Sequence, residues 1–171
     1  MKRSFPTPIL KPTGNRLPVA AILHNVRSLY NVGAFFRTAD AVGLDHLYLS
    51  GFTGSPPHRQ IAKTALGAEQ SVAWSRDDAR EVIPRVRSAG WDVAAIETIE
   101  NAVDLFDWQP VFPAMVVFGH EVEGLPAELV AVCTTRVRIP MLGTKRSLNV
   151  ATAGGVVLYE LLRKFRCGGQ Y

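Results

Sequence analysis

Short, continuous apolar runs recur along this 171-residue chain, and they restrict its fold more than any other feature. A strand with one face in water alternates apolar and polar residues, whereas a strand covered on both faces is apolar throughout. Runs of the second kind predict a mostly parallel sheet with helices on both faces. The predicted strands occupy residues 19–23, 46–50, 71–74, 92–97, 114–119 and 135–139.

Helical patterns fill the segments between these strands. The first helix is expected to end at Gly43, since glycine often terminates helices, and its apolar face consists of Val32, Phe35, Phe36, Ala39 and Val42. A short helix is expected near 58–65, and a longer one from a capping box at Ser75 and Asp78 to Ala89. The alternation of strands and helices predicts a three-layer α/β domain.

The last helix is expected to start near Leu148, and it contains two adjacent glycines, Gly154 and Gly155. Glycine inside a helix costs about 1 kcal/mol relative to alanine. We therefore expect another element to pack very close to the backbone at this point.

The composition fits one folded domain, with 47% apolar and 20% charged residues. We expect an extended, basic, Pro-rich arm over residues 1–17 and a single domain over residues 18–171. The net charge of +4 and the pI near 9.3 favour an anionic partner such as a nucleic acid.

Several other classes of protein are disfavoured. No apolar run approaches the length of a membrane span, so we expect no membrane association and a cytoplasmic location. The fingerprints GxGxxG and GxxxxGK[ST] are both missing, which argues against NAD and nucleoside triphosphate chemistry. We expect no metal site, because ligand spacing is absent from Cys133, Cys167 and the four histidines His24, His46, His58 and His120.

Three polar loops follow predicted strands. They contain "HNVRSLYNVGAFFRTADAVG" at 24–43, "FGHEVEGLP" at 118–126, and the stretch from Arg138 to Val150. Ligands of open α/β sheets bind at the carboxyl ends of the strands. These loops are therefore the predicted ligand site.

Together with "IPMLGTKRSLNVATAGGVVLYE", the first two loops resemble the three signature motifs of the SPOUT superfamily, specifically the TrmH/SpoU family of RNA ribose 2'-O-methyltransferases. The resemblance covers residues from about 19 to 165. It implies an α/β domain with a deep C-terminal trefoil knot, S-adenosylmethionine as cofactor, tRNA or rRNA as substrate, and a homodimer.

The resemblance also implies which residues bind the cofactor, largely through backbone groups. These positions are Thr98, Gly119, Ile139, Met141 and Leu148. At Gly119 the missing β-carbon would let the adenosine lie against the chain. Read from the residues alone, Gly119 could be a simple turn glycine, and Ile139 and Leu148 could be core residues.

The catalytic residues that the resemblance implies are Asn31, Arg37, Glu121, Ser147 and Asn149. By position, Asn31 and Ser147 are also natural helix N-caps, and Glu121 could orient the nucleoside or favour a positive sulfonium, whereas Glu123 is expected to be solvated. Arg37 is expected to leave the apolar face of its helix and face the site. Because arginine stays protonated in proteins, we expect it to align and polarise the 2'-hydroxyl, with the acceptor of the proton left open.

Basic residues on the arm and loops provide dispersed contacts for RNA phosphates, which position a substrate without reading its sequence. They are Lys2, Arg3, Lys11, Arg16, Arg27, Arg59, Lys63, Lys145 and Arg146. Two alternatives stay open, namely an RNA-binding protein without activity and a SPOUT enzyme that methylates a base. The joint presence of the five catalytic residues disfavours the first alternative.

Overall fold

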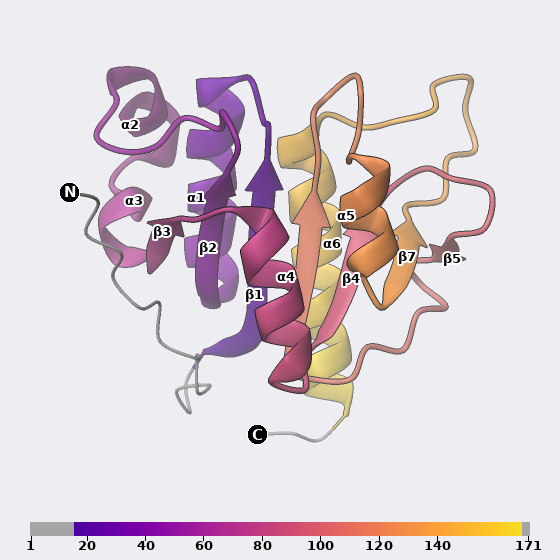
Figure 1. Ribbon diagram of the computed structural model, residues 1–171. Helices are drawn as coiled ribbons and strands as arrows, with labels where there is room; N and C mark the ends of the chain where they lie inside the picture. Colours follow the sequence, from indigo (N-terminus) through magenta and orange to yellow (C-terminus); the bar gives the residue numbers. More distant parts are fainter. Residues whose placement is uncertain (1–15, 169–171) are drawn as a thin grey trace.

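A seven-stranded parallel sheet forms the centre of the protein (Figure 1). The computed structural model describes residues 16–168, and within them every strand pair is parallel, in the order β3-β2-β1-β6-β4-β7-β5. The prediction of a parallel sheet is confirmed. The strands are β1 Leu17–His24, β2 Leu44–Ser50, β3 Trp74–Arg76, β4 Asp92–Ile96, β5 Val103–Asp104, β6 Ala114–Phe118 and β7 Thr135–Arg138.

Helices cover both faces of this sheet, as predicted for a three-layer domain (Figure 1). The helices α1, α2 and α6 pack on one face, where Leu23 and Phe118 join their apolar side chains. The helices α4 and α5 pack on the other face, against Ile22 and Val117. Their bounds are α1 Leu29–Val42, α2 Arg59–Ala65, α3 Ala68–Ser71, α4 Ala79–Ser88, α5 Ala127–Val132 and α6 Val150–Cys167.

The strand order brings distant loops to one edge of the sheet. In the sheet, β6 lies between β1 and β4, and β7 lies between β4 and β5, although β6 and β7 are the last two strands in the sequence. Because the strands are parallel, the segments that follow β1, β4, β6 and β7 meet at the carboxyl edge, which is uppermost in Figure 1. The trefoil knot that the resemblance implies stays a prediction.

Some local predictions were wrong. The third strand does not occupy 71–74, because Ser71 still belongs to α3 and pairing starts only at Trp74, opposite Leu47. Ser75 lies in β3, and the N-cap of α4 is Asp78, whose side chain accepts from the backbone N–H of Arg80. The structure also contains α3, α5 and β5, which are short elements that no periodicity predicted.

The predicted arm falls mostly outside the described residues. Within the part of the arm that the structure describes, Leu17 already pairs with Leu44 and is buried. In residues 16–168, no helix is both long and apolar enough to cross a membrane.

The helices α1 and α6 approach each other closely at one of the two glycines. A β-carbon at Gly154 would overlap the ring of Phe35, with Cδ2 only 2.8 Å away. At Gly155 a β-carbon would meet nothing within 4 Å. The expected close packing is therefore confirmed at Gly154 and was wrong at Gly155.

This difference gives a matched pair of substitutions. We expect Gly154→Ala to lower the free energy of unfolding by about 1–3 kcal/mol, because the methyl group overpacks the α1–α6 contact. Gly155→Ala should instead raise it by about 0.5–1 kcal/mol through helix propensity alone. Urea unfolding at neutral pH measures both, and equal effects would contradict the packing difference.

Candidate functional site

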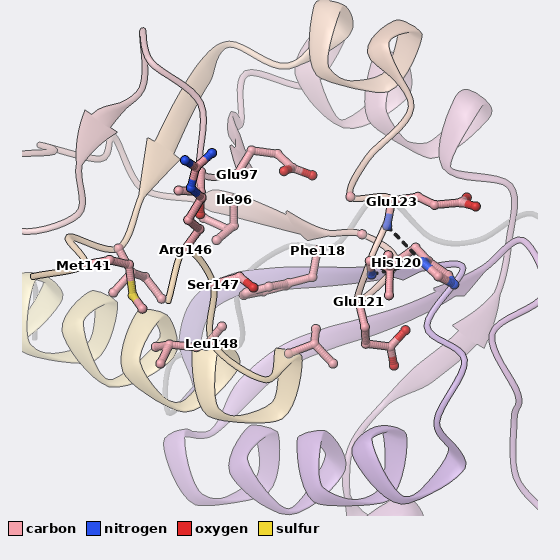
Figure 2. A pocket seen from close by; sticks show the side chains of 17 residues that line it. Ile96, Glu97, Phe118, His120, Glu121, Glu123, Met141, Arg146, Ser147 and Leu148 are labelled. Carbon is pink, nitrogen blue, oxygen red and sulfur yellow. Dashed lines mark hydrogen bonds between the residues drawn. The ribbon is translucent and has the colours of Figure 1, made fainter. Parts of the chain in front are cut away.

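A cavity of about 260 Å³ opens at the carboxyl edge of the sheet (Figure 2). Its walls come from the end of β4, the segment 118–124, the loop 139–148 and the start of α6. All five predicted cofactor-binding residues line it, and so do Glu121 and Ser147 of the predicted catalytic set. The three polar loops identified in the sequence thus meet in one place, with two of them forming the cavity itself.

The lining of this cavity has two chemical characters. One part is apolar and includes Phe118, Ile139, Leu148 and Val150, whereas three carboxylates and one guanidinium line the rest. The charged side chains are Glu97, Glu121, Glu123 and Arg146. An apolar wall suits a flat ring system, and the excess of carboxylates suits a positively charged group.

A tight turn forms the part of the wall that follows β6. His120 and Gly124 exchange two backbone hydrogen bonds of 3.2 and 2.9 Å, and His120 Nδ1 accepts from the backbone N–H of Val122 and of Glu123 (Figure 2). A β-carbon at Gly119 would lie 2.5 Å from the carbonyl carbon of Gly124. Gly119 is therefore required by the turn itself. That its missing β-carbon also makes room for a ligand stays a prediction.

The cavity lining also contains Glu97, which the sequence pattern did not indicate because it falls inside the predicted strand 92–97. Its half-buried carboxylate lines the cavity and accepts a hydrogen bond from the backbone N–H of Leu125. Burial raises the pKa of Glu97, partly offset by that hydrogen bond. An acid as the last residue of an apolar strand, directly before a predicted ligand residue, was the available signal.

Glu121 joins the cavity wall to the start of α1. Its carboxylate accepts from the backbone N–H groups of Arg27 and Ser28 at 3.1 and 3.2 Å, and from Asn31 Nδ2 at 3.3 Å. Partial burial would raise the pKa of Glu121, but these hydrogen bonds outweigh burial and lower it. Figure 2 shows the side chain turned toward α1 and away from the cavity centre. Glu121 thus lines the cavity and also anchors the loop to α1. Its role toward a ligand stays a prediction.

Asn31 and Asn149 extend this contact to the third motif. Asn149 Nδ2 donates to Asn31 Oδ1 at 3.1 Å, while Asn149 Oδ1 accepts from the backbone N–H of Ala151 and of Thr152. Asn149 is therefore the N-cap of α6, and Ser147 was wrongly predicted to be that cap. Likewise the N-cap of α1 is Ser28, not Asn31. The result is a hydrogen-bonded chain, Glu121–Asn31–Asn149, across three distant segments.

Arg37 is not part of the hydrogen-bonded chain Glu121–Asn31–Asn149. It is exposed and follows Asn31 by six residues, which is about 9 Å along the helix axis. It borders a separate hollow together with Leu66 of the α2–α3 connection and Tyr159 of α6. Arg37 does not line the cavity, since α1 begins at the carboxyl edge and Arg37 follows its first residue by eight positions. Its catalytic role stays a prediction.

The basic residues predicted for RNA are exposed wherever the structure describes them, and these are Arg16, Arg27, Arg59, Lys63, Lys145 and Arg146. Lys2, Arg3 and Lys11 lie outside the described residues. The four histidines are hydrogen-bonded, and burial lowers the pKa of His46 to about 4. Residues 16–168 contain no group of three or more His, Cys, Asp or Glu residues that could hold a metal ion.

Comparison with known families gives one match over most of the chain. Residues 18–159 match the SpoU rRNA Methylase family. A tRNA (guanosine(18)-2'-O)-methyltransferase from Thermus thermophilus is 32% identical over 154 residues, which are 90% of this chain and 78% of that enzyme. A TrmH-family relative from Staphylococcus haemolyticus is 31% identical over 86% of this chain, and this chain spans only 59% of that relative.

A solved structure has the same fold. The AdoMet-bound rRNA methyltransferase from Sinorhizobium meliloti superposes with a TM-score of 0.83 at 30% identity. The superposition covers 92% of this chain and 60% of that chain. The fold of this protein therefore has its counterpart in a structure described as AdoMet-bound.

The anchoring role of Glu121 can be tested against its neighbour Glu123. We expect Glu121→Gln to lower the free energy of unfolding by about 1 kcal/mol at pH 7, because an amide cannot accept from all three donors. Glu123→Gln should change it little, since Glu123 is exposed and its carboxylate accepts no hydrogen bond from residues 16–168.

The effect should also depend on pH. The folded-state pKa of Glu121 is lowered, so its stabilisation is complete above the unfolded pKa and is lost as the pH falls through the folded pKa. Urea unfolding of both variants at pH 7 and below pH 4 measures this. A Glu121→Gln deficit that stays constant over that range would rule out the carboxylate as the anchor.

Proposed function

Because this chain belongs to the SpoU rRNA Methylase family, we propose that it transfers a methyl group from S-adenosylmethionine to a ribose 2'-hydroxyl of RNA. The observation that supports this most is the gathering of three motif segments at one cavity, with Glu121, Asn31 and Asn149 in one hydrogen-bonded chain. The name of the Thermus relative gives 2'-O-methylation of tRNA, and the Sinorhizobium structure contains AdoMet.

The cavity fits this cofactor by its chemistry. The apolar wall of Ile139, Leu148 and Val150 suits the adenine ring, and the carboxylates of Glu97 and Glu123 suit the positive groups of the methionine part. Thr98, Gly119 and Met141 complete the set that would hold it. When bound, S-adenosylmethionine supplies a methyl carbon made electrophilic by a positively charged sulfur.

The residues beside the cavity would position the ribose. Asn31 Nδ2 donates one hydrogen to Glu121 and has a second available, and the Ser147 hydroxyl lines the cavity. Both can hydrogen bond the ribose and hold its 2'-oxygen in line with the methyl carbon. Alignment of this kind lowers a barrier by about 7–11 kcal/mol. As the new C–O bond forms, the methyl–sulfur bond of the sulfonium would break, a neutral thioether would leave, and the hydroxyl proton would pass to solvent water.

Arg37 does not line the cavity of its own chain but borders a separate hollow, so its catalytic role would be supplied to a second copy. The exposed Leu66 and Tyr159 beside it are 65% and 53% accessible, and a homodimer that covers them would carry Arg37 to the partner's site. The guanidinium, which stays protonated, would then clamp a phosphate and stabilise the developing alkoxide.

The substrate that this proposal assigns is tRNA or rRNA, and the proposed location is the cytoplasm. Arg27, Arg59, Lys63, Lys145 and Arg146 are exposed and would contact phosphates. Binding of RNA without catalysis and methylation of a base are the competing functions.

Methyl transfer to separated RNA fractions tests the proposal directly. We expect labelled S-adenosylmethionine to label the tRNA or the rRNA fraction, and digestion followed by mass spectrometry to give a 2'-O-methylnucleoside. A labelled base would instead establish the base-methylating function. No label in either fraction, together with no cofactor binding by calorimetry, would contradict the proposed activity and favour RNA binding without catalysis.

The proposed role of Arg37 gives a second test. Arg37→Lys should lower turnover at least tenfold, because lysine lacks the planar fork, while the cofactor affinity stays unchanged. Arg37→Lys mixed with Ser147→Ala should recover about a quarter of the wild-type activity, since half the dimers then contain one intact site. Near-normal turnover of Arg37→Lys would contradict the catalytic role of Arg37. No recovery of activity on mixing would contradict a site shared between two subunits.

A further inference from the structure

A second hollow adjoins the cofactor cavity. Its volume is about 460 Å³, which lies within the range of small-ligand sites. The segment from His120 to Val122 lines both, so it forms a shared wall. The remaining lining comes from residues 27–31 at the start of α1 and from Gln60 of α2.

The lining of this hollow includes the exposed aromatic side chain of Tyr30. Tyr30 is in the first turn of α1 with 44% of its surface exposed, whereas the apolar residues on the opposite face of that helix are buried. The Thr64 hydroxyl donates to the Tyr30 backbone carbonyl oxygen at 2.9 Å, and Lys63 Nζ lies 6.0 Å from the centroid of the Tyr30 ring. Exposed aromatic rings beside basic groups stack on unpaired nucleobases.

The lining of the same hollow includes the polar side chains of Gln60 and Arg27. Gln60 and Arg27 are both exposed and line the hollow, and among residues 16–168 neither side chain has a hydrogen-bond or ion-pair partner. An amide can donate to and accept from the edge of a base, and a guanidinium suits a phosphate. The hollow thus offers contacts for each part of a nucleotide.

We propose that this hollow binds the nucleotide that carries the target ribose, with its base stacked on Tyr30, its edge at Gln60 and its phosphate at Arg27. This inference rests on the proposed function. Asn31 lines the hollow beside the shared wall, so a base on Tyr30 places its own ribose between Asn31 and the cofactor cavity. Because a base inside a duplex cannot stack on a side chain, the target nucleotide is unpaired.

The experiment measures stacking of a single base. The probe is a trinucleotide with a central 2-aminopurine between two abasic ribose phosphates, and the control probe is fully abasic. We expect the wild type to bind the 2-aminopurine probe about tenfold more tightly than the abasic one, with quenched fluorescence. Tyr30→Ala should abolish both the preference and the quenching, and Tyr30→Phe should keep them.

Two controls test whether the base preference depends on Tyr30 specifically. Phe106→Ala removes another exposed aromatic, 56% accessible and not among the residues lining the hollow, and should leave the preference unchanged. The cofactor affinity of Tyr30→Ala, measured by calorimetry, should equal that of the wild type because Tyr30 does not line the cofactor cavity. An equal affinity of the wild type for both probes, or a preference that survives in Tyr30→Ala, would overturn the inference.

The proposed function can fail separately. If the wild type transfers no methyl group to either RNA fraction but still prefers the 2-aminopurine probe, the base site stands without the activity. If methyl transfer occurs and Tyr30→Ala leaves both the probe preference and the KM for RNA unchanged, the activity stands and the base site is wrong.

Discussion

The hydrogen-bonded carboxylate of Glu121 is the interaction on which the site depends. A parallel sheet brings loops from distant parts of the chain to one edge, but it does not fix their positions relative to one another. Glu121 does so by accepting from two backbone N–H groups at the start of α1 and from Asn31, which in turn pairs with Asn149. The cavity wall, the start of α1 and the start of α6 are therefore joined by polar side chains.

The sequence predicted the sheet and the location of the site because both depend on strong, repeated signals. Continuous apolar runs such as 114–118 indicate strands covered on two faces, and the polar segments that follow them had to meet at one edge. Short elements carry no such repeat. The two residues of β5 and the four of α3 cannot show a period, so they emerged only from the three-dimensional contacts.

The roles of single residues were harder to predict, because they depend on which donors a side chain meets. Asn31 and Ser147 have the residue types of helix caps, yet Ser28 and Asn149 cap the helices. Glu97 was overlooked because its partner, the backbone N–H of Leu125, is 28 positions away in the chain. Arg37 has the expected exposure, but it is absent from the cavity lining and borders a separate hollow with Leu66 and Tyr159.

The amide pair between Asn31 and Asn149 has a consequence for the loop 139–149. Both side chains are accessible to water, so separating them costs only about 1 kcal/mol. The loop 139–149 has no regular structure, whereas β7 and α6 on either side are held by the sheet and the core. Separation of this pair would therefore free the loop 139–149 from α1 without disturbing β7 or the buried face of α6.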